Sequence, residues 1–114
     1  MPPSVVVVIR EDPWKTHRPV EALRIALGLS TGENPMTVVL LDQAPVLISE
    51  DLEEIVDGEI LEKYLPSFKH LKIPFAVLSG TGSHFRLDPE FRVSELSEEA
   101  IQSLISGSDR TLVF

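Results

Sequence analysis

The stretch that decides the fold is residues 5–9, which read Val-Val-Val-Val-Ile, an unbroken run of β-branched side chains. A strand without alternating polar residues is typical of a parallel sheet that is covered on both faces. Apolar residues then recur at helical spacing over 20–27, with Thr16 as the expected helix cap, and a second apolar run occupies 36–41. Strand, helix and strand in this order predict a βαβ unit.

The rest of the chain continues the alternation. The first expected element is a helix over 49–65 that is interrupted at Gly58, where Pro66 either ends the helix or starts a new turn. It is followed by a strand over 73–78, a short strand over 91–93, a helix that Ser97 caps and Gly107 ends, and a strand over 110–114. This order predicts the α/β class, with a three-layer sandwich around a mostly parallel sheet of about five strands and helices on both faces. A length of 114 residues fits one domain, 1–114.

Composition excludes several classes of function. The chain has 10 basic and 18 acidic side chains, a formal charge of −8, and its basic residues are scattered, so direct binding to nucleic acid is not expected. The longest apolar run is too short to span a membrane and nothing resembles a signal peptide, so we expect a soluble, cytoplasmic protein. The absence of cysteine excludes disulfides, thiolate metal sites and a thiol nucleophile.

Ligands of parallel sheets bind beyond the carboxyl ends of the strands, which here are followed by residues 12–18, 42–46 and 79–84. The first of these loops offers Trp14, His17 and Arg18 as candidate ligand-binding residues. Cations next to the free N–H groups of a helix N-terminus would attract an anion. In the alternative interpretation, Trp14 covers the end of the sheet and the cationic side chains are solvated.

The loop over 79–84 offers four further candidates, namely Ser79, Thr81, Ser83 and His84. In the alternative interpretation, its hydroxyls bond to their own backbone in a turn. The loop lacks the sequence patterns of a nucleophile elbow, a phosphate loop and a dinucleotide fold. The three histidines are far apart in sequence, so neither a metal site nor a cofactor is expected, and no catalytic residue is assigned.

Several segments together resemble the DsrE/DsrF/TusC-like family. The segments are the valine run, the helix reading Pro-Val-Glu-Ala-Leu-Arg-Ile-Ala-Leu over 19–27, the second strand with Ala-Pro-Val over 44–46, Leu-Pro-Ser-Phe over 65–68 before the third strand, and Asp109 before the last apolar strand. The resemblance implies a parallel-type sheet between helices and assembly into trimers, hexamers or mixed-subunit rings. It also implies a part in sulfur relay, for tRNA thiolation or for sulfur oxidation.

Sulfur-carrying members of that family place a cysteine just after the third or fourth strand, where it becomes a persulfide. The corresponding region here is Ser-Gly-Thr-Gly-Ser over 79–83, and a hydroxyl cannot hold a persulfide. The resemblance therefore implies a cysteine-free, non-catalytic member that serves as a scaffold or as a partner subunit.

Three hypotheses remain open at this point. The first is a homo-oligomer, or a hetero-oligomer with related sulfur-relay subunits, that uses the apolar region 46–71 with Tyr64 and Phe68 as interface candidates. The second is a small module that binds an anion or a nucleotide at the carboxyl ends of the strands. The third is an enzyme that uses Ser83 or His84, which would also need an orienting acid.

Overall fold

The computed structural model describes residues 3–114, so the first two residues of the expected 1–114 domain lie outside the described residues. The elements in chain order are β1 (Val5–Ile9), α1 (Arg18–Leu29), β2 (Met36–Leu40), the 3₁₀ helix η1 (Ala44–Ile48), α2 (Gly58–Leu71), β3 (Phe75–Leu78), the 3₁₀ helix η2 (Thr81–Ser83), β4 (Val93–Leu96), α3 (Glu98–Ser106) and β5 (Arg110–Val113). Within residues 3–114, no helix is both long enough and apolar enough to cross a membrane.

The five strands form one sheet in the order β4-β3-β2-β1-β5, and every neighbouring pair is parallel. All five side chains of β1 are buried, as its lack of polar alternation predicts. Val7 lies in the larger core cluster, on one face of the sheet, while Val6 and Val8 lie in a smaller cluster on the other. The valine run is therefore covered from both sides.

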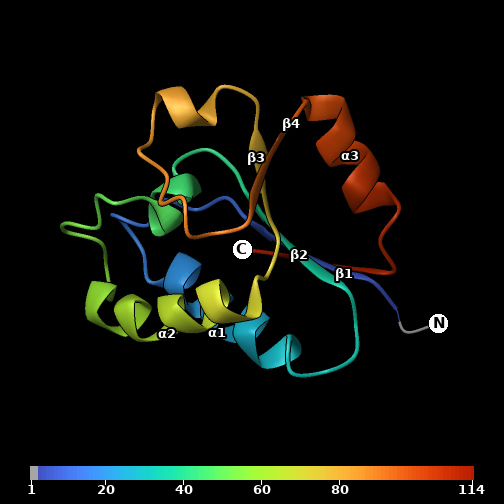
Figure 1. Cartoon of the computed structure of the whole chain (residues 1–114), viewed down its shortest axis with the longest axis horizontal. Helices are drawn as coiled ribbons and strands as arrows, with labels where there is room; N and C mark the ends of the chain where they lie inside the picture. Colours follow the sequence, from blue (N-terminus) through green and yellow to red (C-terminus); the bar gives the residue numbers. More distant parts are fainter. Residues whose placement is uncertain (1–2) are drawn as a thin grey trace.

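The helices divide between the two faces as the chain reverses its direction across the sheet. From β1 through β2 to β3 the chain moves across the sheet in one direction. The helices between these strands, α1 and α2, pack against each other on one face of the sheet (Figure 1). From β4 the chain returns across the sheet to β5, and α3 covers the opposite face. Right-handed crossovers require this division. The predicted α/β architecture of a parallel sheet between helices is confirmed.

The helix expected over 49–65 was wrong at both ends. The structure has no helix over 50–57, and Glu54 and Asp57 have left-handed backbones, with φ of 62° and 60°. Tertiary hydrogen bonds hold this segment instead, because Val56 N donates to Pro13 O at 3.0 Å. The helix α2 begins at Gly58 and continues through Pro66 to Leu71. Glu62, four residues before that proline, is exposed, so water can satisfy the carbonyl that lacks an N–H donor.

Two smaller expectations also needed correction. The fourth strand spans Val93–Leu96 rather than 91–93, and Phe91 precedes it with its side chain buried in the larger core cluster. His17, not Thr16, is the N-cap of α1 and makes no capping bond, although the Thr16 hydroxyl accepts a hydrogen bond from Arg18 N at 3.3 Å. Ser97 caps α3 as predicted, since its hydroxyl accepts a hydrogen bond from Ala100 N.

A partly buried ion pair ties the β3–β4 connection to α2. Lys69 Nζ lies 2.8 Å from Asp88 Oδ2 and 3.0 Å from Glu90 Oε2, and it stands 5.0 Å from the centre of the Phe91 ring. The Lys69 ammonium, helped by the backbone N–H of Glu90, lowers the pKa of Asp88 from its usual value. Hydrogen bonds to Asp88 and Glu90 likewise raise the pKa of Lys69.

We expect Asp88→Asn to lower the free energy of unfolding at neutral pH by about 1–2 kcal/mol, because Lys69 would lose its better-buried partner. The folded-state pKa of Asp88 lies below the unfolded one, so this stabilisation is present above about pH 4 and is lost as the pH falls further. Urea unfolding at neutral and acidic pH measures the difference. Glu90→Gln is the control, since the Glu90 side chain is 72% exposed. A loss that stays constant down to pH 2 would contradict the role of the charge.

Candidate functional site

The loops that follow β2 and β3 enclose a cavity of about 660 Å³ together with the loop that follows β1. Parallel strands bring their carboxyl ends to one edge of the sheet, which explains why three segments distant in sequence meet there. The residues around the cavity are Trp14, Asp42, Gln43, Val46, Ser49, Asp51, Leu78, Ser79, Gly80, Thr81, His84 and Phe85. Its volume is within the range of small-molecule sites.

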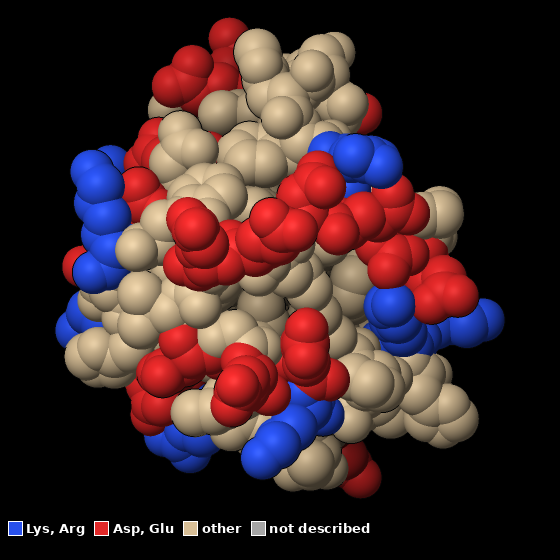
Figure 2. Space-filling view, turned by 90° about the vertical axis from the view of Figure 1, so that its left-hand side faces the viewer, with Lys and Arg blue, Asp and Glu red and all other residues tan. Residues whose placement is uncertain are grey.

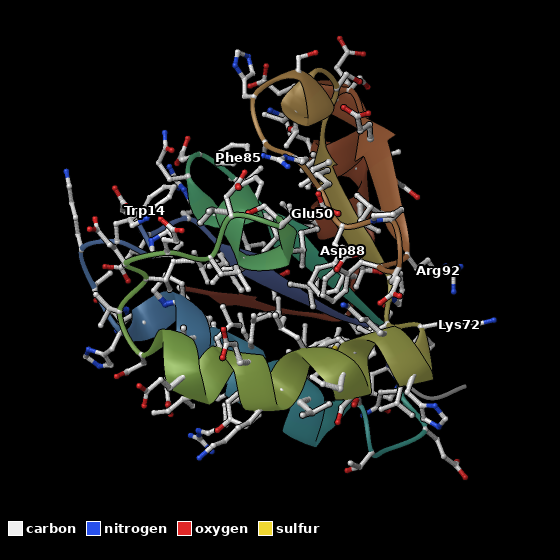
Figure 3. All side chains as sticks on the ribbon, turned by 60° about the vertical axis from the view of Figure 1, so that its left-hand side comes forward. Trp14, Glu50, Lys72, Phe85, Asp88 and Arg92 are labelled. Carbon is white, nitrogen blue, oxygen red and sulfur yellow. The ribbon has the colours of Figure 1, made fainter. Side chains whose placement is uncertain are left out.

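Trp14 is the contribution of the first loop, and hydrogen bonds hold it in place. Its backbone N–H donates to Asp12 Oδ1 at 2.9 Å, and its indole Nε1–H donates to the carbonyl of Glu53 at 3.1 Å. Trp14 is the only tryptophan of the chain, and it remains 38% exposed. Figure 3 shows Trp14 and Phe85 on the same side of the molecule, at the end away from Lys72 and Arg92.

The loop after β3 is shaped by its glycines and by one carboxylate from the neighbouring strand. Gly80 has a φ of 92°, a left-handed backbone that side chains rarely adopt. The N–H groups of Gly80 and Gly82 both donate to Glu95 Oε1, at 2.9 and 3.3 Å. Successive N–H groups of this kind form an anion-binding concavity, and here the chain's own glutamate occupies it. Thr81 and His84 are thereby held at the cavity.

The loop after β2 adds carboxylates. Asp42 lies two residues after the end of β2 and has a left-handed backbone, φ 55°, and η1 then carries the chain to Ser49. The buried Ser49 hydroxyl donates to Val46 O at 2.8 Å and accepts from Asp51 N at 3.1 Å, which fixes the turn before Asp51. Asp51 faces Arg86, whose guanidinium lies 3.5 Å away on an exposed side chain.

The electrostatic character of this edge is negative. Asp42 and Asp51 border the cavity, and no lysine or arginine is among the described residues that line it. Acidic side chains form a band across this side of the molecule, while most lysine and arginine side chains stand toward its edges (Figure 2). An anion would therefore gain little attraction from the side chains that surround the cavity.

The structure brings together some of the sequence candidates and separates others. Four of them line the cavity, namely Trp14, Ser79, Thr81 and His84. His17, Arg18 and Ser83 do not. Arg18 forms an ion pair with Glu11 and its guanidinium carbon lies 5.6 Å from the centre of the Phe114 ring. The guanidinium of Arg18 thus turns toward the end of β5 rather than toward the cavity.

The Thr81 hydroxyl is bonded within its own loop. Thr81 Oγ1 donates to the carbonyl of Leu78, as the turn interpretation of this loop predicts. Within residues 3–114, no hydrogen bond joins the side chains of Ser83 and His84, and no group of three or more acidic or histidine side chains is placed to hold a metal ion.

Sequence reasoning missed Asp51 and Phe85 and selected no residue from 42–46. Asp42 had a usable signal, since it directly follows an apolar strand and so lies at the carboxyl edge of a parallel sheet. Asp51 had none, because it fell within the helix that was expected over 49–65 and not in a loop at the carboxyl edge of the sheet. Its position depends on the turn at Ser49 and on the antiparallel bridge between Ser49 and Leu87.

The interface candidates are also separated by the structure. Phe68 is fully buried in the core and so cannot contact another subunit, which corrects the expectation from sequence. Tyr64 is partly buried on α2. Of the twelve apolar residues of region 46–71, seven are buried, three are partly buried, and only Ile60 and Leu71 are exposed. The sheet and its helices cover more apolar surface than the sequence pattern suggested.

The chain has the DsrE-like α/β fold, with a parallel sheet of five strands between helices. Among solved structures, it is similar to the crystal structure of the YchN protein from E. coli, with a TM-score of 0.78. That similarity covers 100% of both chains at 16% sequence identity, and at this identity it shows the fold alone. No model of a known protein family matches the chain, and no curated relative matches it.

Proposed function

We propose that this chain is a non-catalytic DsrE/TusC-like protein that acts in the cytoplasm as a scaffold or partner subunit related to sulfur relay. The observation that carries the proposal is the loop after β3. It occupies the position at which sulfur carriers of the resembled family hold their cysteine, yet it reads Ser-Gly-Thr-Gly-Ser. A persulfide requires a thiolate sulfur, so this chain cannot itself be the carrier.

The engagement of Glu95 supports the same proposal. Free N–H groups in the loop after β3 would stabilise a negative charge on a sulfur atom held there. In this chain the N–H groups of Gly80 and Gly82 are already bonded to Glu95. The loop is thus built as a closed structural turn, which fits a subunit that leaves the chemistry to a partner.

The assembly part of the proposal now depends on different surfaces. Val113 on the edge strand β5 is 57% exposed, and Leu112 beside it is also exposed. Among residues 3–114, β5 pairs only with β1, so its other edge presents backbone groups that can pair with another strand. Leu71 adds exposed apolar surface at the end of α2. We expect an oligomer, of this chain or with related subunits, to use these surfaces.

The experiment combines the chain with a cysteine desulfurase, cysteine and purified cysteine-bearing DsrE- or TusC-like subunits. We expect it to co-elute with those subunits, or with itself at a multiple of 12.7 kDa, and to gain no sulfur by intact-mass spectrometry. Val113→Glu should release it, while the surface variant Glu62→Gln should not. A stable added sulfur, or a monomer that binds none of these subunits, would overturn the proposal.

A second candidate function is a small-ligand-binding module, which the cavity at the carboxyl ends of the strands favours. The anion or nucleotide first expected for such a module is not favoured, because Asp42 and Asp51 border the cavity. The class of ligand must follow from that lining.

A further inference from the structure

We propose that the cavity at the carboxyl ends of β2 and β3 binds a small organic cation, with an alkylammonium or guanidinium group seated between Trp14, Asp42 and Asp51. The inference rests on the second candidate function, the ligand-binding module, and specifies its ligand. It is independent of the scaffold role.

The aromatic side chains provide the first argument. Trp14 and Phe85 both line the cavity, and aromatic faces attract cations through the ring quadrupole. The indole N–H of Trp14 is bonded to Glu53 O, so the N–H is satisfied and the ring is held in one orientation. A ring fixed before binding loses little conformational entropy when a ligand packs against it. An exposed tryptophan that is nevertheless anchored is therefore suited to contact a ligand.

The carboxylates provide the second argument. Asp42 forms no ion pair with any described residue, so its charge has no cationic partner within residues 3–114. Among residues 3–114, Asp51 forms an ion pair only with Arg86, whose side chain is exposed, and such exposed pairs contribute little to stability. A ligand cation would supply the missing positive charge.

The surroundings favour the same sign of charge. Three exposed glutamates, Glu50, Glu53 and Glu54, are close in sequence to the cavity residues Ser49 and Asp51. They belong to a protein with a formal charge of −8. Charges of one sign around a cleft raise the local concentration of the opposite ion. Ser79 and His84, which also line the cavity, offer polar contacts for the rest of a ligand.

The test uses the single tryptophan, whose indole N–H gives one signal in a proton–nitrogen correlation spectrum of the full chain. Titration with n-butylammonium and with butylguanidinium at low ionic strength should shift this signal in a saturable manner. Neutral n-butanol and inorganic phosphate should not shift it. The double variant Asp42→Asn, Asp51→Asn should weaken cation binding about tenfold or more, which corresponds to about 1.4 kcal/mol. Glu62→Gln removes an exposed charge on α2 and should leave the affinity unchanged.

The outcomes separate the two proposals. Saturable binding of both cations that depends on the two aspartates supports the inference. Equal affinity in the double variant and the unchanged chain would overturn it, as would binding of n-butanol or phosphate in preference to the cations. Those last results would leave a ligand-binding module with another ligand. If none of the four compounds shifts the indole signal, both the cation site and the module are wrong, while the scaffold proposal stands on its own test.

Discussion

Replacing Phe68 with alanine is expected to lower the free energy of unfolding by about 3–5 kcal/mol. The Phe68 ring is fully buried and lies 5.5 Å from the Phe75 ring, which in turn lies 5.7 Å from that of Phe91. These three rings join α2, β3 and the segment before β4, so the cavity left by the truncation would loosen three elements together. Small domains have only about 5–15 kcal/mol of stability in total.

Urea unfolding followed by circular dichroism measures this loss, with Leu71→Ala as the control on the same helix. Leu71 is 53% exposed, and its truncation should change stability by about 0.5 kcal/mol or less. Phe68→Leu keeps most of the buried volume and should show a smaller loss in the same direction. Equal effects at positions 68 and 71 would contradict the burial of Phe68. Phe68→Glu would place an unpaired charge in the core, so it would unfold the chain rather than divide an oligomer.

Replacing Ile101 with alanine is expected to lower the free energy of unfolding by about 2–5 kcal/mol. It should also remove the protection of the α3 amides against hydrogen exchange. Ile101 is the one fully buried side chain of this helix and packs in the smaller core cluster with Val6 and Val8. α3 has only nine residues, and a helix of that length is marginal without tertiary packing. One side chain therefore anchors the cover of a whole face of the sheet.

Hydrogen exchange tests the local part of this prediction and denaturant unfolding tests the global part. In Ile101→Ala, the amides of α3 should exchange much faster than in the unchanged chain. Gln102→Ala, at the exposed neighbouring position, should leave both measurements close to unchanged. Retained protection of α3 in Ile101→Ala would mean that Leu104 and Ile105, which pack against the same cluster, suffice to hold the helix.

Local sequence patterns predicted the elements whose determinants are local. The valine run became β1, Ser97 caps the start of α3 through its hydroxyl, and α3 ends just before Gly107. The same reasoning failed over 49–57, because the conformation there depends on partners distant in sequence. Val56 bonds to Pro13, and the indole of Trp14 bonds to Glu53. No pattern within the segment records those contacts.

The candidate site divides in the same way. The alternation of strands and helices placed the loops at 12–18, 42–46 and 79–84 at one edge of the sheet, and the structure confirms that they meet there. Which side chains turn inward was decided by contacts that form only in the folded chain. Arg18 turns to Glu11 and Phe114, and Trp14 turns to the cavity.

By itself, the sequence determined the class of fold, because the hydrophobic pattern of a strand and the capping of a helix depend on residues close together in the chain. It also determined the absence of a sulfur-carrying thiol, because composition does not depend on how the chain folds. Only the tertiary structure decided that the charge around the cavity is negative. Arg18, which the sequence placed close to Trp14, pairs with Glu11 and does not line the cavity, and two aspartates from other segments border the cavity. Charges act through space rather than along the chain, so the potential of a cleft follows from how the loops pack.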